Sequence, residues 1–117
     1  MPLESVIRKE GPVAFVALKG KVVLGDASEA LRAQVEQLAA EGCQQIILNL
    51  AGVPFIDSAG LGALALSYTR VKAAGGMLKL AGAPPRVQDA LEMTRLTRLF
   101  PPYASEQEAA ASFADVA

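Results

Sequence analysis

The sequence predicts a single α/β domain in which a β-hairpin precedes helices and strands in alternation. Two short apolar segments, 6–9 and 13–19, flank residues 10–12, Glu-Gly-Pro, which favour a tight turn between two strands. Farther along the chain, segments with helical spacing of apolar residues alternate with short apolar runs, a pattern typical of right-handed crossovers between strands. The 117 residues are 52% hydrophobic, which is enough for one well-buried core, so we expect one domain over residues 1–117.

The first helix is predicted over residues 27–41, because apolar residues recur at helical spacing and Gly42 ends the pattern. These apolar positions are Leu31, Val35 and Leu38. Asp26 precedes the helix and Glu29 follows three residues later, which resembles a capping box. The next apolar run, 46–50, is continuous and starts with β-branched residues, as expected of a central parallel strand covered on both faces.

The second half of the chain continues the alternation. A helix is predicted over residues 59–74, ending at two glycines, and a strand over 77–81. A third helix is expected to begin at residues 84–85, Pro-Pro, and a fourth at the capping box of residues 105–108, Ser-Glu-Gln-Glu, running to about residue 113. The inward-facing positions of the two middle helices are Leu61, Leu64, Ala65, Tyr68 and Val71, then Val87, Leu91 and Thr94.

Composition argues against several classes of function. The formal net charge is −1, so the chain lacks the broad basic surface that binds nucleic acid. No run approaches the roughly 18 apolar residues of a membrane span, and residues 1–9 lack the apolar stretch of a signal peptide. We therefore expect a cytoplasmic protein without a membrane or nucleic-acid partner. Cys43 is the only cysteine, cannot form an internal disulfide, and is assigned no function.

The most informative segment is 55–62, Phe-Ile-Asp-Ser-Ala-Gly-Leu-Gly, where an apolar run stops and a helical pattern starts. Ser58 is thereby placed at the amino end of a helix, beside Asp57. In one interpretation Ser58 is an ordinary N-cap, Asp57 forms the turn, and Gly60 and Gly62 permit close packing of helix on strand. In the other, the glycines expose backbone so that another protein can approach Ser58, since each weakens the helix by about 1 kcal/mol relative to Ala.

Enzymatic interpretations fit the sequence poorly. A serine hydrolase of the nucleophile-elbow type needs Gly two residues before its Ser, where this chain has Ile56, and a His base, which it lacks entirely. Lys21 follows Gly20, but Val22 then stands where a P-loop has Ser or Thr. The acidic residues do not cluster at metal-ligand spacing. We expect no catalysis, no cofactor and no metal.

Residues 56–62 resemble the phosphorylation-site signature of STAS domains of the bacterial anti-sigma factor antagonist type. Further landmarks of the pattern are Gly20, Ala27, Leu31, Asn49, Leu50, Gly76, Leu78 and Leu80. The resemblance covers the whole chain and implies a single STAS-type domain: a central mixed β-sheet opened by a hairpin, with helices packed mainly on one side. The chain departs from the pattern at residues 21–23, Lys-Val-Val, and at Asn49, where many members carry acidic residues. Asp57 is the remaining carboxylate of the usual cluster.

By this resemblance, Ser58 is phosphorylated by an anti-sigma factor that is also a serine kinase of the histidine-kinase-like ATPase type. The unphosphorylated form binds that anti-sigma factor and frees a sigma factor, and a serine phosphatase resets the cycle. The expected partner surface comprises Asp57, Ser58, Ala59, Gly60, Leu61 and Gly62, with the exposed turn at Gly25 and Asp26. The free protein is expected to be a monomer, since no coiled-coil heptad is present.

Phosphate on Ser58 would add a charge of about −1.5 to −2 beside Asp57, and repulsion and desolvation would then disfavour a docked partner. A helix amino terminus tolerates such an anion, so the fold itself is not expected to change. The alternative is a constitutive scaffold or a transporter-associated STAS subunit, in which Ser58 is only a helix cap.

Overall fold

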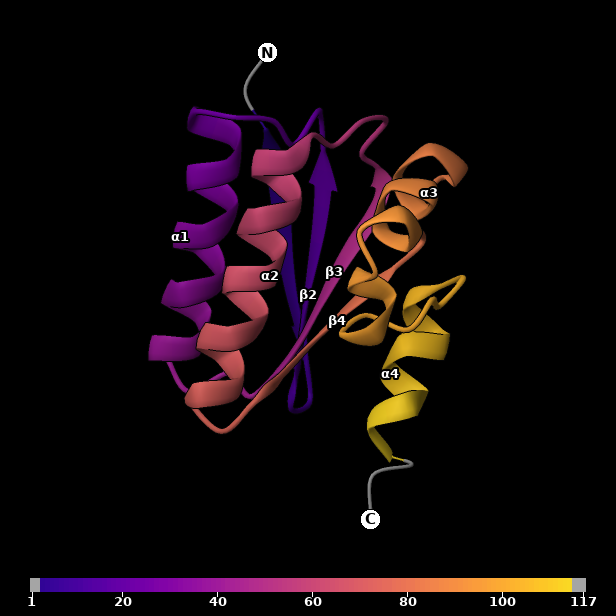
Figure 1. Ribbon diagram of the computed structural model, residues 1–117. Helices are drawn as coiled ribbons and strands as arrows, with labels where there is room; N and C mark the ends of the chain where they lie inside the picture. The colour runs from indigo at the N-terminus through magenta and orange to yellow at the C-terminus, as the bar shows by residue number, and fades with distance from the viewer. Residues whose placement is uncertain (1–2, 115–117) are drawn as a thin grey trace.

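The computed structural model describes residues 3–114, which form one α/β domain on a four-stranded sheet (Figure 1). The strands lie in chain order: β1 (Glu4–Glu10), β2 (Val13–Lys19), β3 (Gln45–Gly52) and β4 (Met77–Ala81). β1 pairs with β2 antiparallel, whereas β2, β3 and β4 pair in parallel. The prediction of a mixed sheet opened by a hairpin is confirmed.

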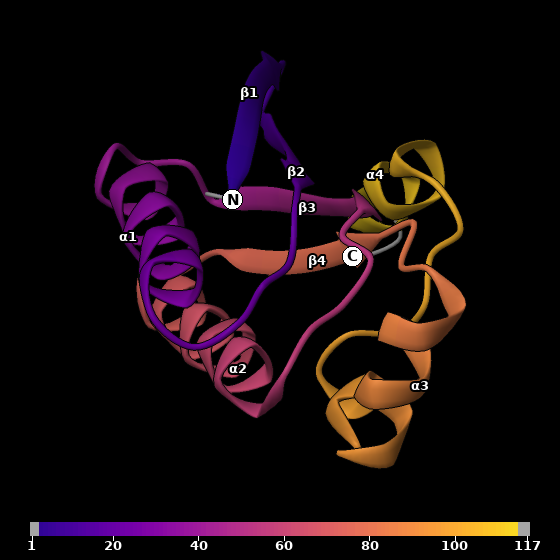
Figure 2. The same ribbon diagram turned by 90° about the horizontal axis from the view of Figure 1, so that it is seen from above.

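The helices lie mainly on one side of the sheet, as expected (Figure 2). That side carries α1 (Asp26–Ala40), α2 (Ser58–Ala73) and α3 (Pro85–Met93), which is followed by a short 3-10 turn, Leu96–Arg98. The last helix, α4 (Glu106–Ala114), lies against the opposite face of the sheet near β3 and β4. The helices predicted from periodicity thus agree with the observed ones to within one or two residues.

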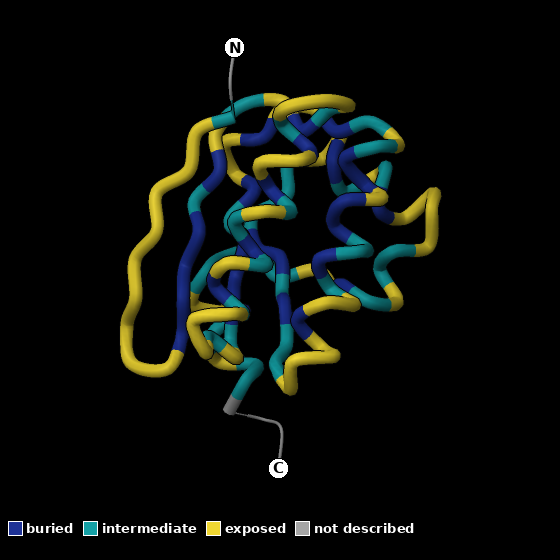
Figure 3. Tube along the Cα trace, turned by 90° about the vertical axis from the view of Figure 1, so that its left-hand side faces the viewer, coloured by how far each residue is buried: buried dark blue, intermediate teal, exposed yellow. Residues whose placement is uncertain are grey.

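Alternation along the strands divides the core between the two faces. Ala14, Val16 and Leu18 of β2 face the larger core under α1, α2 and α3, whereas Val13 and Phe15 face α4. β3 divides in the same way, since Ile46, Leu48 and Leu50 are buried on one side and Ile47 on the other. Cover on both faces explains why residues 46–48 of β3 are apolar without alternation. Figure 3 shows the contrast with β1, which is exposed along its whole length.

The start of α1 differs from the prediction. Asp26 is the first residue of the helix, and Gly25, at φ 104°, occupies the cap position, where no side chain caps the helix. The chain turns sharply into α1 and requires a positive φ at the cap position. Gly adopts this conformation without strain, so Gly and not a capping side chain stands there. Ser28 closes the turn because its hydroxyl donates to the Gly25 carbonyl at 3.1 Å. The predicted capping box is therefore wrong.

The two C-terminal helices confirm one prediction and correct another. Ser105 caps α4, because its hydroxyl accepts the Glu108 N–H at 3.2 Å. Glu108 reaches back to the N–H of Ala104 at 2.9 Å, one residue before the cap. In α3, Val87 and Leu91 are buried as predicted, but Thr94 follows the last helical residue and is exposed. Its hydroxyl donates to the Ala90 carbonyl at 2.8 Å and so covers the helix end instead of entering the core.

A polar network joins α4 to the sheet. The Asn49 amide donates to the Glu106 carboxylate at 3.0 Å, and Arg8 donates to the other oxygen of that carboxylate at 3.1 Å. The Asn49 oxygen accepts the N–H of Ala51 at 2.9 Å. The hydrogen bond from Asn49, followed by the one from Arg8, lowers the pKa of Glu106 below its usual value. An aspartate at position 49 could not donate this bond, so the network explains why an amide stands there.

We predict that Asn49→Asp lowers the free energy of unfolding by about 1–3 kcal/mol near neutral pH, because it removes a donor and opposes two carboxylates. Glu106 has a lowered pKa in the folded state, so its stabilising contribution is complete above the ordinary value of 4.5 and is lost as the pH falls through the lowered one. The difference in free energy of unfolding between wild type and Asn49→Asp should therefore become smaller as the pH falls through the same acidic range. Urea denaturation of both proteins against pH measures this. Equal stability at neutral pH would contradict it.

Candidate functional site

The candidate site lies where the carboxyl ends of β2 and β3 meet, at the amino end of α2 (Figure 1). We call residues 57–62 together with the β2–α1 loop, residues 20–25, the Ser58 site. A parallel bridge between Val22 and Ile56 holds the two segments together. Around it, the Val22 N–H donates to the Phe55 carbonyl at 3.0 Å and the Asp57 N–H to the Val22 carbonyl at 3.3 Å. The backbone therefore fixes the loop against the start of α2.

Asp57 is the N-cap of α2, and its carboxylate also binds the β2–α1 loop. One oxygen accepts the Gly60 N–H at 2.9 Å, and the other accepts the Leu24 N–H at 3.0 Å. These two bonds, the one from Leu24 first, lower the pKa of Asp57. The interpretation of Ser58 as the helix cap is therefore wrong: the cap is the residue before it.

Ser58 is the first residue of α2 and is exposed. Since Asp57 satisfies the Gly60 N–H, the Ser58 hydroxyl has no capping function in the part of the chain that the structure describes. The sequence contains no histidine that could act as its base. The exposed hydroxyl thus lies beside a carboxylate and at the amino terminus of a helix.

The two glycines of the site serve different purposes. A Cβ atom on Gly60 would collide with the Val22 carbonyl oxygen and lie 2.6 Å from Cγ1 of Ile56. Close packing of α2 on the bridge therefore requires Gly60. A Cβ atom on Gly62 would meet nothing within 4 Å, and the residue is exposed. The interpretation as close packing is therefore confirmed for Gly60, whereas packing does not require Gly62.

The expected partner surface is only partly accessible. Ser58 and Gly62 are exposed, Asp57 and Ala59 are half-buried, and Gly60 is buried. Leu61 is 8% exposed and belongs to the core beneath α2, so it supports the site from below. Gly25 and Asp26 lie at the exposed turn before α1, as the sequence suggested.

Sequence reasoning missed an apolar surface beside Ser58. Leu24 is 79% exposed, although its own N–H is held by Asp57. Together with Val23 and Pro54 it lines a hollow of about 680 Å³, whose lining also includes Lys21 and Asp26. An exposed leucine over an apolar hollow is typical of a protein-binding surface. The signal in the sequence was the apolar run Val-Val-Leu, residues 22–24, in a segment predicted to be a loop.

Residues 3–114 lack two features, a cluster of metal ligands and a membrane-spanning helix. No three His, Cys, Asp or Glu side chains in this range come together as the ligands of a metal ion would. None of the helices in the same range is both long and apolar enough to cross a membrane.

We predict opposite effects of adding one methyl group at the two glycines. Gly60→Ala should lower the free energy of unfolding by about 2–3 kcal/mol, because backbone must move to relieve the overlap. Gly62→Ala is the matched control and should raise it by about 0.8–1 kcal/mol, the difference in helix propensity. Urea denaturation measures both values. Similar effects of the two substitutions would contradict the packing described for Gly60.

We also predict that Asp57→Asn accelerates hydrogen exchange at one of the two amides that the carboxylate binds, Leu24 or Gly60, since an amide side chain offers only one accepting oxygen. Asp57→Ala should accelerate exchange at both. The N–H of Val53, which donates to the Leu50 carbonyl at 2.9 Å, is the internal control and should not change. Amide exchange by NMR measures this, and unchanged protection at Leu24 in Asp57→Ala would contradict the link between loop and helix.

Two curated relatives align with most of the chain. An anti-sigma F factor antagonist of Paenibacillus polymyxa is 28% identical over 110 residues, covering 93% of each chain. The BtrV protein of Bordetella bronchiseptica, assigned by name to the anti-sigma factor antagonists, is 29% identical over 99 residues, covering 85% of each.

Solved structures share the fold at low sequence identity. An anti-sigma factor antagonist from Mycobacterium paratuberculosis has a TM-score of 0.83 at 21% identity, covering 94% of this chain and 92% of its own. The phosphorylated form of the Bacillus cell fate determinant SpoIIAA has a TM-score of 0.71 at 21% identity, covering 94% and 99%. A sulfate transporter family protein from Wolinella succinogenes has a TM-score of 0.77 at 23% identity, covering 88% and 85%.

The model of one protein family matches nearly the whole chain. It is the STAS domain, matched over residues 4–109. The match includes all four strands and the Ser58 site. The chain therefore belongs to the STAS domain family.

Proposed function

We propose that the protein is a phospho-switchable binding module of the cytoplasm, an anti-sigma factor antagonist that is not itself an enzyme. Its partner is an anti-sigma factor that is also a serine kinase of the histidine-kinase-like ATPase type. Unphosphorylated protein binds this partner and frees a sigma factor, phosphorylation of Ser58 ends the interaction, and a serine phosphatase restores it. The names of the two curated relatives support the antagonist role.

The position of the Ser58 hydroxyl carries the proposal. The hydroxyl is exposed on the first residue of α2, and Asp57 performs the capping that would otherwise occupy it. A kinase can therefore modify Ser58 without removing a bond on which the helix depends. The phosphorylated SpoIIAA structure, which has the same fold, shows that such a domain can carry phosphate.

The surroundings of Ser58 explain how one phosphate could prevent binding. The lowered pKa of Asp57 keeps its carboxylate ionised, so phosphate of about −1.5 to −2 charge would stand beside an existing negative charge. Leu24, which lines the hollow, donates its backbone N–H to the same carboxylate. A partner that covers this hollow must also remove water from the phosphate, which is unfavourable.

The second candidate function is a constitutive scaffold or a transporter-associated subunit. The likeness to a sulfate transporter family protein favours it. In that case Ser58 would be neither modified nor needed for binding. Phosphate mapping on the native protein and binding by Ser58 variants distinguish the two functions.

We predict that Ser58→Asp weakens binding to the kinase-type partner about a hundredfold or more, because like charges and desolvation oppose docking. Ser58→Ala should bind as wild type and resist phosphorylation. Ser5→Asp adds the same charge on exposed β1 and is the matched control, which should bind normally. The measurements are calorimetry with the anti-sigma factor kinases of the same cell and tandem mass spectrometry of the native protein.

Circular dichroism accompanies these measurements, because the proposal requires the fold of Ser58→Asp to remain intact. A collapsed spectrum would replace the charge explanation with loss of structure. If Ser58 is never modified and all variants hold one common partner, the scaffold function takes the place of the switch.

A further inference from the structure

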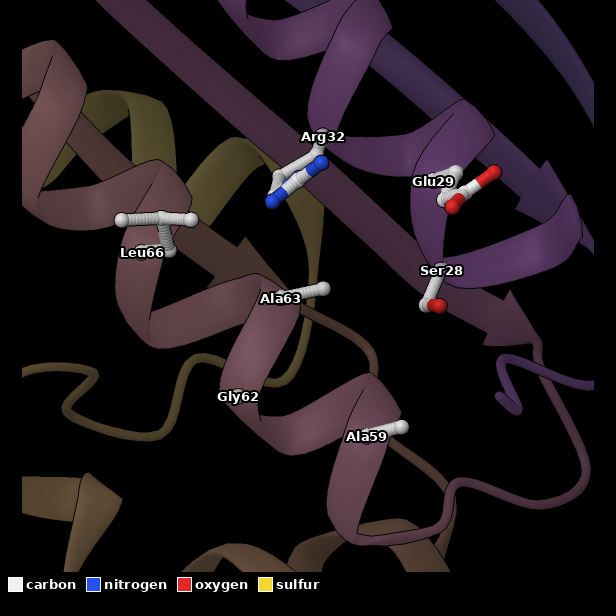
Figure 4. Close-up of a pocket in the computed structure, with 7 residues that line it drawn as sticks. All are labelled: Ser28, Glu29, Arg32, Ala59, Gly62, Ala63 and Leu66. Atoms are coloured by element: carbon white, nitrogen blue, oxygen red, sulfur yellow. The ribbon is translucent and has the colours of Figure 1, made fainter. Parts of the chain in front are cut away.

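A groove runs between α1 and α2, immediately beside the Ser58 site (Figure 4). We call it the α1–α2 groove. Its volume is about 300 Å³. Side chains of α1 and a wall of small residues on α2 line it: Ser28, Arg32, Ala59, Gly62, Ala63 and Leu66. Ala59 directly follows Ser58, so the groove begins in the first turn of α2, next to the serine in the chain.

Arg32 has an unsatisfied hydrogen-bond donor in the groove. Its Nε atom is buried and lacks a hydrogen-bond partner among the described residues. None of the ion pairs formed within residues 3–114 includes Arg32. In Figure 4 its side chain extends toward α2, whereas Glu29, one turn earlier on α1, points away from it. Arg32 as a whole is half-buried, and buried donors are nearly always satisfied by protein atoms or water, so the unpaired Nε–H is a place where a further acceptor fits.

Gly62 keeps the groove open on the opposite side. The residue lies inside α2, where Gly is unfavourable, yet an added Cβ atom would meet nothing within 4 Å. The packing of the fold therefore does not explain this glycine. Ala59 and Ala63 on either side of it are also short, so the wall of α2 leaves room for a side chain that enters from outside.

We propose that the α1–α2 groove receives the carboxylate side chain of an Asp or Glu of the partner protein, which pairs with Arg32. A guanidinium presents parallel donors that match a carboxylate, and such a pair satisfies the Nε atom that is otherwise left unpaired. The lining contains one cation, Arg32, and one acid, Glu29, so it matches a single negative charge better than a phosphate dianion. The inference rests on the proposed function, since it assumes a partner docked over Ser58.

The groove can be tested without the partner. Acetyl-glutamate is titrated into labelled protein while the Arg32 Nε–H and the Ala63 and Leu66 amides are observed by NMR. We expect saturable shifts that acetyl-glutamine, which has the same shape without the charge, does not cause. Gly62→Leu, which fills the groove, and Arg32→Gln should each abolish the amide shifts. The control Arg86→Gln, at an exposed position of α3, should leave them unchanged. Equal responses to acetyl-glutamate and acetyl-glutamine, or a saturable response to inorganic phosphate alone, would overturn the proposal.

The same variants test the contact in the complex. Arg32→Gln should weaken binding to the kinase-type partner about ten- to a hundredfold, the usual effect of losing a hydrogen bond to a charged group. Arg32→Lys should recover part of the loss, and Arg86→Gln should have no effect. If wild type binds in a Ser58-dependent manner while Arg32→Gln and Gly62→Leu bind equally well, the groove proposal fails and the switch stands. If no kinase-type partner binds wild type, the proposed switch fails. The acetyl-glutamate titration then decides by itself whether the groove binds a carboxylate.

Discussion

The Ser58 site depends on one carboxylate that accepts two backbone N–H groups from distant parts of the chain. Asp57 binds Gly60, within the first turn of α2, and Leu24, in the β2–α1 loop. The first bond starts the helix, and the second fixes the exposed leucine beside Ser58. Both require α2 to lie close to the Val22–Ile56 bridge, which only a residue without a side chain at position 60 permits. The Ser58 hydroxyl does not cap the helix because its neighbour Asp57 does so.

The sheet and the helices could be predicted from the sequence because their apolar periodicity is strong, as the continuous run of β3 illustrates. The caps could not, because neighbouring polar residues are equally good candidates in sequence. Asp57 and Ser58 can each accept an N–H, and the choice depends on Leu24, which lies 33 positions earlier in the chain. Asp26 is the first residue of α1 and not its N-cap, contrary to the prediction. Gly25 occupies the N-cap position, with a positive φ that the path of the loop into α1 requires.

The two departures from the family pattern have different physical explanations. Asn49 belongs to an internal network, where its amide donates to Glu106 and an aspartate would oppose that carboxylate. In the segment 21–23, Val22 is buried in the core, whereas Lys21 and Val23 line, with Leu24, the hollow beside Ser58. The first change preserves the docking of α4. The second changes the charge of the surface beside Ser58.

The charges around Ser58 affect which partner can bind and how phosphorylation acts on the complex. The carboxylate of Asp57 is occupied by backbone donors, so the side chains that remain for a partner are the apolar Leu24, the cations Lys21 and Arg32, and the acids Asp26 and Glu29. A partner that places a carboxylate in the α1–α2 groove has its own negative charge beside α2, the helix that begins at Ser58. Phosphate on Ser58 would repel that carboxylate as well as Asp57, and charges that face each other across a dry interface interact more strongly than charges in water. The contact that strengthens the complex before phosphorylation would therefore also make it sensitive to phosphorylation.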